Sequence, residues 1–279
     1  MRADLHIHTY YSDGAYSPAQ IAAMAREAGL SLISMTDHDS LAGLEEKTRA
    51  AADSGLSYVP GWEVSAYQGD LKVHILGYGC RICAPYEQFL RARREGALAR
   101  AEDIIARANE YFGLDVTLAD AERFHQKKDA PLHTMHIVAA FAERLGRDKG
   151  DLYAAAFEPG RPCHSLIGRP SPQDAIDVIH ASGGIAVLAH PGRIKLSAER
   201  RFSLMDELVG RGLDGIECSH SDHTEEQTAQ FAAYARLRGL LQTGGSDFHA
   251  EGRNRVIGQP PFSPSEELLA AFRRLCGSK

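Results

Sequence analysis

Apolar runs that end in a histidine or a carboxylate recur along the chain, and this pattern constrains the fold more than any other feature. Leu32-Ile33-Ser34-Met35 leads into Thr36-Asp37-His38, and Ile185-Ala186-Val187-Leu188 leads into Ala189-His190. An unpaired charge at the end of a buried run would be costly. In α/β proteins, however, the carboxyl ends of the strands are where sites are built. The pattern therefore predicts strands that deliver polar side chains to one shared site.

Two of these pieces carry ligand-type residues in pairs. His6 and His8 are two residues apart, and so are Asp247 and His249. On a strand, residues i and i+2 point to the same face, so each pair aims together. One His-x-His pair alone is more often two structural histidines, but the coincidence of several motifs favours a multinuclear metal site. The candidate ligands are His6, His8, Asp13, His38, Glu63, His74, His190, Asp247 and His249.

Strands alternate with helical patterns in the first and last thirds of the chain, which predicts parallel βαβ units. Strands are expected at residues 4–7, 30–36, 56–60, 71–76, 185–189, 213–217 and 240–243, and helices at 17–29, 40–54 and 172–181. From about residue 85 to 168 the pattern is helical throughout, with helices expected at 86–112, 132–145 and 151–157. We expect one domain from residues 1–84 and 169–279, and a helical insertion, 85–168, that acts as a lid or substrate-binding subdomain.

Composition excludes several classes of protein. The net charge of the 279 residues is −6, which does not favour a stable complex with DNA, because such complexes rely on many basic phosphate contacts. No run of about 18 apolar residues predicts a membrane span, and the start has no apolar signal-peptide core. Five cysteines, an odd number, suit free thiols in a reducing cytoplasm. Cys80 and Cys83 have CxxC spacing without a second pair, which favours an incidental pair over a zinc or redox site.

The ligand-type motifs resemble those of the PHP (polymerase and histidinol phosphatase) family of the amidohydrolase superfamily. The resemblance rests on His6-Ile7-His8, Asp13, Thr36-Asp37-His38, Glu63, His74, Ala189-His190-Pro191 and Ser246-Asp247-Phe248-His249. It implies an α/β fold, a distorted (β/α)7 barrel with a helical insertion, that holds two or three divalent metal ions.

The family likeness also implies how the metals are shared. The first would be held by His6, His8, Glu63 and Asp247, the second by Glu63, His74 and His190, and the third by Asp13, His38 and His249. Glu63 would bridge the first two. Nitrogen and oxygen ligands together suit Mn²⁺, Fe²⁺ or Zn²⁺. Two adjacent metals lower the pKa of a shared water and polarise a phosphoryl oxygen, so we expect hydroxide attack on a phosphate ester. Glu63, Asp247 and His249 are the expected catalytic residues.

Within the family, the chain is most similar to small cytoplasmic phosphoesterases found near tryptophan-synthesis genes. Members act on 3′,5′-nucleotide bisphosphates, and some trim RNA from its 5′ end. The likeness implies that Arg193, directly after a ligand motif, clamps phosphate, since arginine offers a bidentate fork. His136, His223 and Arg161 are further expected substrate contacts. The relatives carry an arginine two residues before the histidine of the insertion, where this chain has Thr134.

The expected activity is hydrolysis of a phosphomonoester on a small phosphorylated metabolite, such as a 3′,5′-nucleotide bisphosphate. One alternative is a phosphodiesterase that acts on a cyclic ribose phosphate, or a 5′–3′ exonuclease that acts on a short RNA end. An alternative of another class is a non-catalytic metal-binding accessory module, against which the complete ligand set argues. The remaining histidines are interpreted as structural: His125, His133, His164, His180 and His220.

Overall fold

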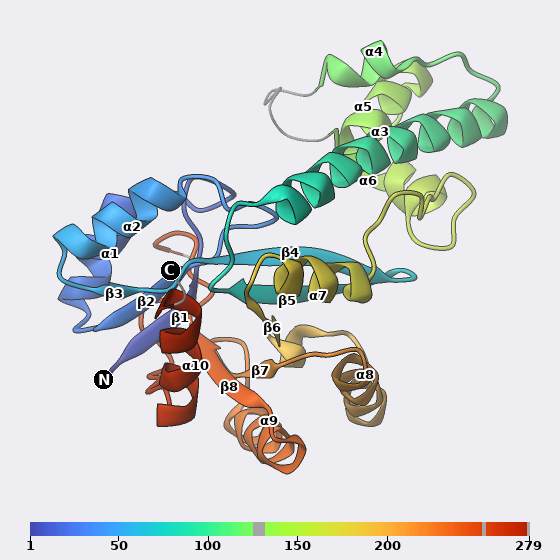
Figure 1. Ribbon diagram of the computed structural model, residues 1–279. Helices are drawn as coiled ribbons and strands as arrows, with labels where there is room; N and C mark the ends of the chain where they lie inside the picture. Colours follow the sequence, from blue (N-terminus) through green and yellow to red (C-terminus); the bar gives the residue numbers. More distant parts are fainter. Residues whose placement is uncertain (125–131, 253–254, 278–279) are drawn as a thin grey trace. The chain divides into compact units, whose positions relative to one another are not determined.

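The computed structural model describes residues 1–124, 132–252 and 255–277, and His125 therefore lies outside the described residues. The chain forms two compact units, the first from Met1–Glu87 and Pro170–Lys279 and the second from Gln88–Arg169 (Figure 1). Strands alternate with helices in the first unit, whereas the second consists of helices. The α/β class expected from the sequence is confirmed.

The first sheet of the larger unit contains three parallel strands in the order β1-β2-β3. They are β1 (Ala3–Ile7), β2 (Leu32–Met35) and β3 (Ser57–Tyr58), and the connecting helices are α1 (Pro18–Glu27) and α2 (Leu44–Asp53). Helix α1 begins as its sequence predicts: Ser17 caps it in a capping box with Gln20, and Pro18 occupies the first turn. Every residue of β1 and β2 is buried, which is typical of strands covered on both faces.

The second sheet contains five strands in the order β4-β5-β6-β7-β8. They are β4 (Gly61–Gln68), β5 (Leu71–Tyr78), β6 (Ile185–Leu188), β7 (Gly215–His220) and β8 (Leu241–Gly245). The pairs β4–β5 and β5–β6 are antiparallel, and β6–β7 and β7–β8 are parallel. The helices α7 (Pro172–Ala181), α8 (Ala198–Gly210), α9 (Glu225–Arg238) and α10 (Glu266–Gly277) accompany this part of the chain, and the 3₁₀ turn η2 (Pro191–Arg193) follows β6.

The two sheets approach each other at both edges without merging into one continuous ladder. An isolated bridge joins Ile7 to Phe248 at one edge, and another joins His38 to Glu63 at the other. A closed seven-stranded barrel is therefore not formed by strand pairing among the described residues. The expectation of parallel βαβ units is wrong for β4 and β5, which pair antiparallel, and β4 was not among the predicted strands. The bridges nevertheless bring the ends of β1, β2, β4 and β8 to one place.

The second unit contains most of α3 (Ala84–Phe112), together with α4 (Leu118–Glu122), α5 (Thr134–Leu145), α6 (Lys149–Leu152) and the π-helical turn η1 (Tyr153–Phe157). Its core packs Phe112 against Phe141 and Phe157. Gly96 and Gly168 lie so close that a Cβ added at Gly168 would stand 2.2 Å from the Cα of Gly96. Among the described residues, no helix combines the length and apolarity that crossing a membrane requires.

Among the residues whose side chains the structure describes, no cluster of metal-ligand type contains a cysteine. Cys80, Cys83, Cys163 and Cys218 are free thiols. Burial raises the pKa of Cys80 to about 12, so its reactive thiolate form is disfavoured. This agrees with the interpretation of Cys80 and Cys83 as an incidental pair.

Candidate metal centre

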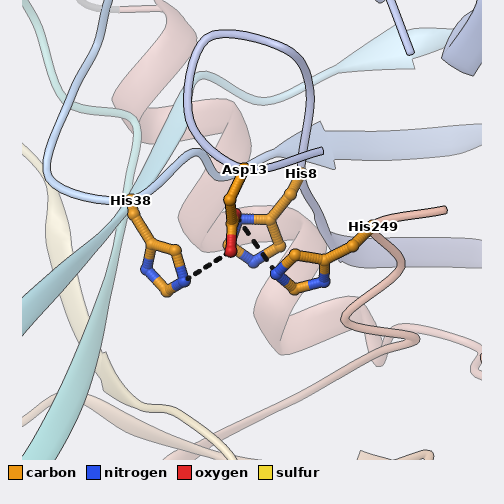
Figure 2. Close-up of side chains that lie close together, drawn as sticks. All are labelled: His8, Asp13, His38 and His249. Atoms are coloured by element: carbon orange, nitrogen blue, oxygen red, sulfur yellow. Dashed lines mark ion pairs between the residues drawn. The ribbon is translucent and has the colours of Figure 1, made fainter. Parts of the chain in front are cut away.

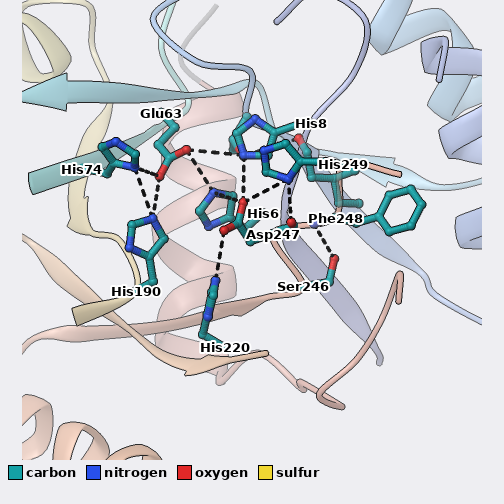
Figure 3. Close-up of polar contacts among 12 residues, drawn as sticks. His6, His8, Glu63, His74, His190, His220, Ser246, Asp247, Phe248 and His249 are labelled. Atoms are coloured by element: carbon teal, nitrogen blue, oxygen red, sulfur yellow. Dashed lines mark hydrogen bonds and ion pairs between the residues drawn. The ribbon is translucent and has the colours of Figure 1, made fainter. Parts of the chain in front are cut away.

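Six separate segments of the larger unit bring the predicted ligands together. His6 lies on β1 and His8 just beyond it, Glu63 lies on β4 and His74 on β5. The other ligands follow strand ends or lie in loops: Asp13, His38, His190, Asp247 and His249. Figure 3 shows Glu63 among His6, His8, His74 and His190, with the Asp247 carboxylate on the other side of His6 and His8. The sequence pattern thus identified a real cluster, although its role as a ligand set remains a prediction.

A first group of donor atoms has the spacing of a tetrahedral site. His8 Nε2 lies 3.3 Å from Glu63 Oε2 and 3.1 Å from Asp247 Oδ1, and His6 Nε2 lies 3.3 and 3.5 Å from the same two oxygens. Donors about 2.1 Å from a tetrahedral metal ion lie roughly 3.4 Å apart. All four side chains are buried. This group is the one that the family resemblance implies for the first metal.

A second group converges on the other oxygen of Glu63. Glu63 Oε1 lies 2.6 Å from His74 Nδ1 and 2.8 Å from His190 Nε2, and these two nitrogens are 3.2 Å apart. His38 Nδ1 also approaches Glu63, at 3.0 Å from Oε2. The two oxygens of one carboxylate therefore face two different groups of imidazole nitrogens, which is the arrangement expected of a bridging ligand.

A third group surrounds Asp13. Figure 2 shows its carboxylate among the rings of His8, His38 and His249. Asp13 Oδ1 lies 3.3 Å from His249 Nε2 and 3.7 Å from His8 Nδ1, and Oδ2 lies 4.0 Å from His38 Nε2. The Asp13 side chain is 53% exposed, so this group is wider and more open than the other two. His8 thus presents one nitrogen to the first group and one to the third.

The buried donor atoms fit metal ions because the protein leaves several of them unsatisfied. His6 Nε2, both ring nitrogens of His8 and Glu63 Oε2 are buried and accept or donate no hydrogen bond among the described residues. Such atoms are costly unless a ligand pairs with them. Burial also lowers the pKa of His38 and His190 to about 4, so both rings are neutral and offer a lone pair. Geometry and donor chemistry together match divalent ions.

The carboxylates of the cluster need compensating positive charge. Burial opposes ionisation of Glu63 and Asp247, yet the neighbouring histidines keep the pKa of both well below the ordinary range. Burial likewise opposes protonation of His8, but the carboxylates of Asp247 and Glu63, 3.1 and 3.3 Å from its Nε2, raise its pKa to about 9. The site therefore attracts cations, and a bound divalent ion would compensate the charge of the carboxylates in place of a proton on His8.

A cavity of about 450 Å³ opens over the cluster, and three cationic side chains line it: Lys72, Arg193 and Arg255. Arg193 Nη1 donates to Asp247 Oδ2 at 2.8 Å, and Arg193 Nε lies 3.4 Å from Asp222 Oδ2. Arg255 donates to the backbone oxygen of Asp247 at 2.9 Å and also contacts its carboxylate. Arg193, the expected phosphate clamp, lines this cavity, and its role remains a prediction, while Lys72 and Arg255 were not anticipated.

The structure gives the other predicted substrate residues different surroundings. His223 is half-buried, Gly192 N donates to its Nε2 at 3.1 Å, and its Nδ1 lies 3.1 Å from the oxygen of Cys218. Backbone groups therefore occupy both ring nitrogens. His136, at the start of α5, and the exposed Arg161 belong to the second unit and are not among the described residues that line the cavity. Their substrate roles remain predictions.

Two residues beneath the cluster were missed or undervalued. Glu217 on β7 is fully buried, and its Oε1 lies 3.0 Å from His6 Nδ1. Its signal in the sequence was a carboxylate at the end of the predicted strand 213–217. His220, interpreted as a structural histidine, is also buried, and its Nε2 lies 3.4 Å from Asp247 Oδ2. His180, by contrast, pairs with Asp214 at 2.7 Å, away from the cluster.

Comparison with known proteins places the chain in a family. The PHP domain matches residues 4–105. A 3′,5′-nucleoside bisphosphate phosphatase of Chromobacterium violaceum is 33% identical over 94% of this chain and 92% of its own length. A phosphoribosyl 1,2-cyclic phosphate 1,2-diphosphodiesterase of Eggerthella lenta is 34% identical over 92% and 98%. The 5′–3′ exoribonuclease Rnm of Escherichia coli is 32% identical over 88% and 84%.

A solved structure supports the same assignment. An amidohydrolase from Chromobacterium violaceum, crystallised with sulfate and no metal, has a TM-score of 0.72 to this chain at 29% identity. The match covers 99% of this chain and 97% of that one. Fold, ligand cluster and sequence likeness agree, and the chain belongs to the PHP family.

Proposed function

We propose that this protein is a metal-dependent phosphoesterase that hydrolyses a phosphomonoester of a small phosphorylated metabolite. A nucleotide such as a 3′,5′-nucleotide bisphosphate is the proposed substrate, with Mn²⁺, Fe²⁺ or Zn²⁺ at two or three sites. The observation that carries the proposal is the buried group of His6, His8, Glu63 and Asp247 beneath a cationic cavity, in which the histidine nitrogens lie 3.1–3.5 Å from the carboxylate oxygens.

Metal ions held there would supply a nucleophilic water at neutral pH and polarise the phosphoryl oxygen. The ligands divide into three groups, one for each ion. His6, His8 and Asp247 would hold the first ion, His74 and His190 the second, and Asp13, His38 and His249 the third. Glu63 would serve the first two, because each of its oxygens faces one group. Glu63, Asp247 and His249 remain the proposed catalytic residues, and Asp247 or His249 would assist proton transfer.

Substrate binding is proposed for the cations above the ligands. Arg193, whose side chain is 43% exposed, already contacts the carboxylate oxygens of Asp222 and Asp247. An incoming phosphate offers the same oxygen geometry, so the guanidinium can exchange a carboxylate for a phosphate. Lys72 and Arg255 line the same cavity and add positive charge. If one phosphate binds at the metals and another binds at these cations, the substrate carries two phosphoryl groups.

The size of the cavity supports a small substrate. Its volume of about 450 Å³ lies in the range of small-molecule sites, roughly 300–1,000 Å³. The net charge of −6 also disfavours a long nucleic-acid contact, which relies on many basic residues. A cyclic ribose phosphate or a short RNA 5′ end remains the competing proposal, since the relatives named for those substrates are about as similar as the phosphatase.

Purified protein, stripped with a chelator and reloaded with Mn²⁺, should be tested on matched substrates. The set is adenosine 3′,5′-bisphosphate, AMP, a phosphoribosyl 1,2-cyclic phosphate and a 5′-phosphorylated oligoribonucleotide. We expect phosphate release from the bisphosphate to exceed release from AMP, and no turnover before reloading. Preferential cleavage of the cyclic phosphate or of the RNA would replace the phosphatase with one of the alternatives. Full activity in metal-free protein, verified by elemental analysis, would refute the whole proposal.

A further inference from the structure

Strand β7 supplies no proposed ligand, yet it places two buried polar side chains against the ligands. Glu217 and His220 are 0% and 1% exposed. A buried carboxylate is costly unless hydrogen bonds and charge compensate for the lost water. Both residues must therefore be explained by what they contact.

The Glu217 carboxylate joins two of the proposed metal groups. Its Oε1 lies 3.0 Å from His6 Nδ1, and its Oε2 accepts the backbone N–H of His190 at 2.7 Å. When His6 Nδ1 carries the proton and donates to Glu217, Nε2 keeps its lone pair. Nε2 is the atom that lies 3.3 Å from Glu63 and 3.5 Å from Asp247. Glu217 thereby selects the tautomer of His6 that a metal requires.

The contact with His190 controls an unusual backbone conformation. His190 has φ 28° and ψ 60°, a region that non-glycine residues seldom adopt. Such a conformation persists only where the surroundings hold it in place. The hydrogen bond from His190 N to Glu217 does this directly after β6, and it aims the His190 ring toward Glu63.

His220 acts in a similar way on the other side of the cluster. Asp222 N donates to its Nδ1 at 3.0 Å, so in the neutral ring Nε2 carries the proton. That nitrogen faces Asp247 Oδ2 at 3.4 Å, as Figure 3 shows. Asp247 Oδ1 remains turned toward His6 and His8.

We propose that Glu217 and His220 are positioning residues for the metal centre: Glu217 couples a ligand of the first metal to a ligand of the second, and His220 orients the carboxylate of Asp247. This inference rests on the proposed ligand set, and it adds that the first two sites form together. Loss of Glu217 should weaken both, whereas loss of a terminal ligand should weaken chiefly its own site.

The test measures Mn²⁺ and Zn²⁺ binding to purified variants by chelator competition and elemental analysis, without substrate. Glu217→Gln keeps the volume, but its amide NH₂ must face either the His6 or the His190 donor. We expect affinity at the first two sites to fall together by roughly 10- to 100-fold. His220→Gln can present its NH₂ near the position of Nε2, so it should retain metal, whereas His220→Leu should lose affinity.

Tyr78→Phe is the matched control, because it removes another buried hydrogen bond, from Tyr78 to the oxygen of Leu5, next to His6 in β1. Melting temperatures of the metal-free variants separate damage to the fold from damage to the site. The inference is overturned if Glu217→Gln binds within about twofold of wild type, if Tyr78→Phe loses as much affinity, or if His220→Gln and His220→Leu behave alike. Wild-type protein that binds metal but hydrolyses no phosphate ester would refute the proposed function and leave this inference standing. Wild-type protein that binds no metal would refute both.

Discussion

At the scale of single residues, Asp247 shows how one carboxylate serves two environments. Its Oδ1 faces His6 and His8, while its Oδ2 meets Arg193, Arg255 and His220. The arginine contacts draw charge away from one oxygen and fix the plane of the carboxylate. In the proposed site, ligand geometry would therefore depend on Arg193 and Arg255, which also line the cavity, and this would couple substrate binding to the shape of the first metal site.

Glu63→Gln should remove at least one metal and lower kcat by about 100-fold or more. Each carboxylate oxygen of Glu63 faces a different group of imidazoles, whereas the amide of Gln has only one oxygen and places an NH₂ group at the other position. Metal content by elemental analysis and kcat on the best substrate are the measurements. Glu207→Gln, on an exposed position of α8, is the control and should match wild type. Normal metal content and kcat in Glu63→Gln would reduce Glu63 to a structural carboxylate.

Arg193→Ala should lower kcat/KM for a bisphosphate by roughly tenfold to a thousandfold, the range for losing a charge-assisted hydrogen bond. Arg193→Lys keeps the positive charge but cannot form two parallel hydrogen bonds to one phosphate, so its kcat/KM should lie between those of wild type and Arg193→Ala. The kcat/KM of Arg193→Ala for p-nitrophenyl phosphate, which lacks a second phosphate, should fall less. Arg200→Ala, on an exposed position of α8, serves as the control. Equal losses on both substrates would assign Arg193 to the reacting phosphate, and no loss would make it a surface charge.

Sequence alone identified the cluster because several of its members share one signal, a ligand-type residue at or just after the end of an apolar run, as at His38 and His190. Glu217 ends a predicted strand but was not identified, because its partners, His6 Nδ1 and the backbone of His190, are distant in sequence. Arg255 has no such signal, because it reaches Asp247 from an irregular segment. The engagement of His223 by backbone groups was equally invisible, because backbone contacts leave no pattern in the sequence.

At the scale of elements, the loop that carries Asp13 is held by a buried ion pair. Asp37 accepts hydrogen bonds from Thr9 and Ser12, and Lys47 Nζ of α2 lies 2.6 Å from Asp37 Oδ2. Lys47 and Asp37 are 1% and 0% exposed. Helix α2 thus secures the loop through a charge in the interior, where leaving one partner alone is expensive.

Lys47→Met should reduce the free energy of unfolding by roughly 3–5 kcal/mol, because it leaves the Asp37 charge buried without its partner. Urea titration measures this loss, and elemental analysis should show weaker metal retention by the Asp13 group. Lys47→Met combined with Asp37→Asn should lose less than the sum of the single changes. Lys195→Met, at an exposed position, should stay within about 0.5 kcal/mol of wild type. Additive losses would mean that the two residues act independently.

Elements with strong local signals were predicted well. Helix α7 has the predicted bounds, Pro172–Ala181, because Ser171 and Pro172 start it in the ordinary way. The β4–β5 hairpin was missed because no strand was predicted over Gly61–Gln68, although Gly69-Asp70 separates the two strands and Gly69 has φ +60°, which suits a tight turn. Antiparallel pairing depends on partners across the sheet, and the alternation of strands and helices elsewhere favoured a parallel reading.

At the scale of the whole molecule, the candidate metal centre ties together strands from both sheets. Glu63 and His74 belong to the second sheet and His6 to the first, while Asp247 follows the last strand, β8. A metal bound there stabilises the folded chain, because the unfolded chain holds no comparable arrangement of ligands. The two sheets are joined by isolated bridges, so ions are expected to matter for their cohesion.

Chelation should lower the melting temperature. Free metal at about 100 times Kd contributes about 2.7 kcal/mol per site. For a unit of this size that corresponds to roughly 5–10 °C. Differential scanning calorimetry with and without chelator measures the shift, and Glu63→Gln should show a smaller one. An unchanged melting temperature would mean that metal binds folded and unfolded chains alike.

The distance along the sequence between His6 and His249 has a consequence for biosynthesis. While the chain is being made, the histidines of the first strand emerge long before Asp247 and His249 are synthesised. A nascent chain would therefore present only partial sites, and the full proposed ligand set would exist only once His249 has been made. Retained metal would then report that synthesis and folding had proceeded at least that far, which would make metal content a useful quality measure for recombinant preparations.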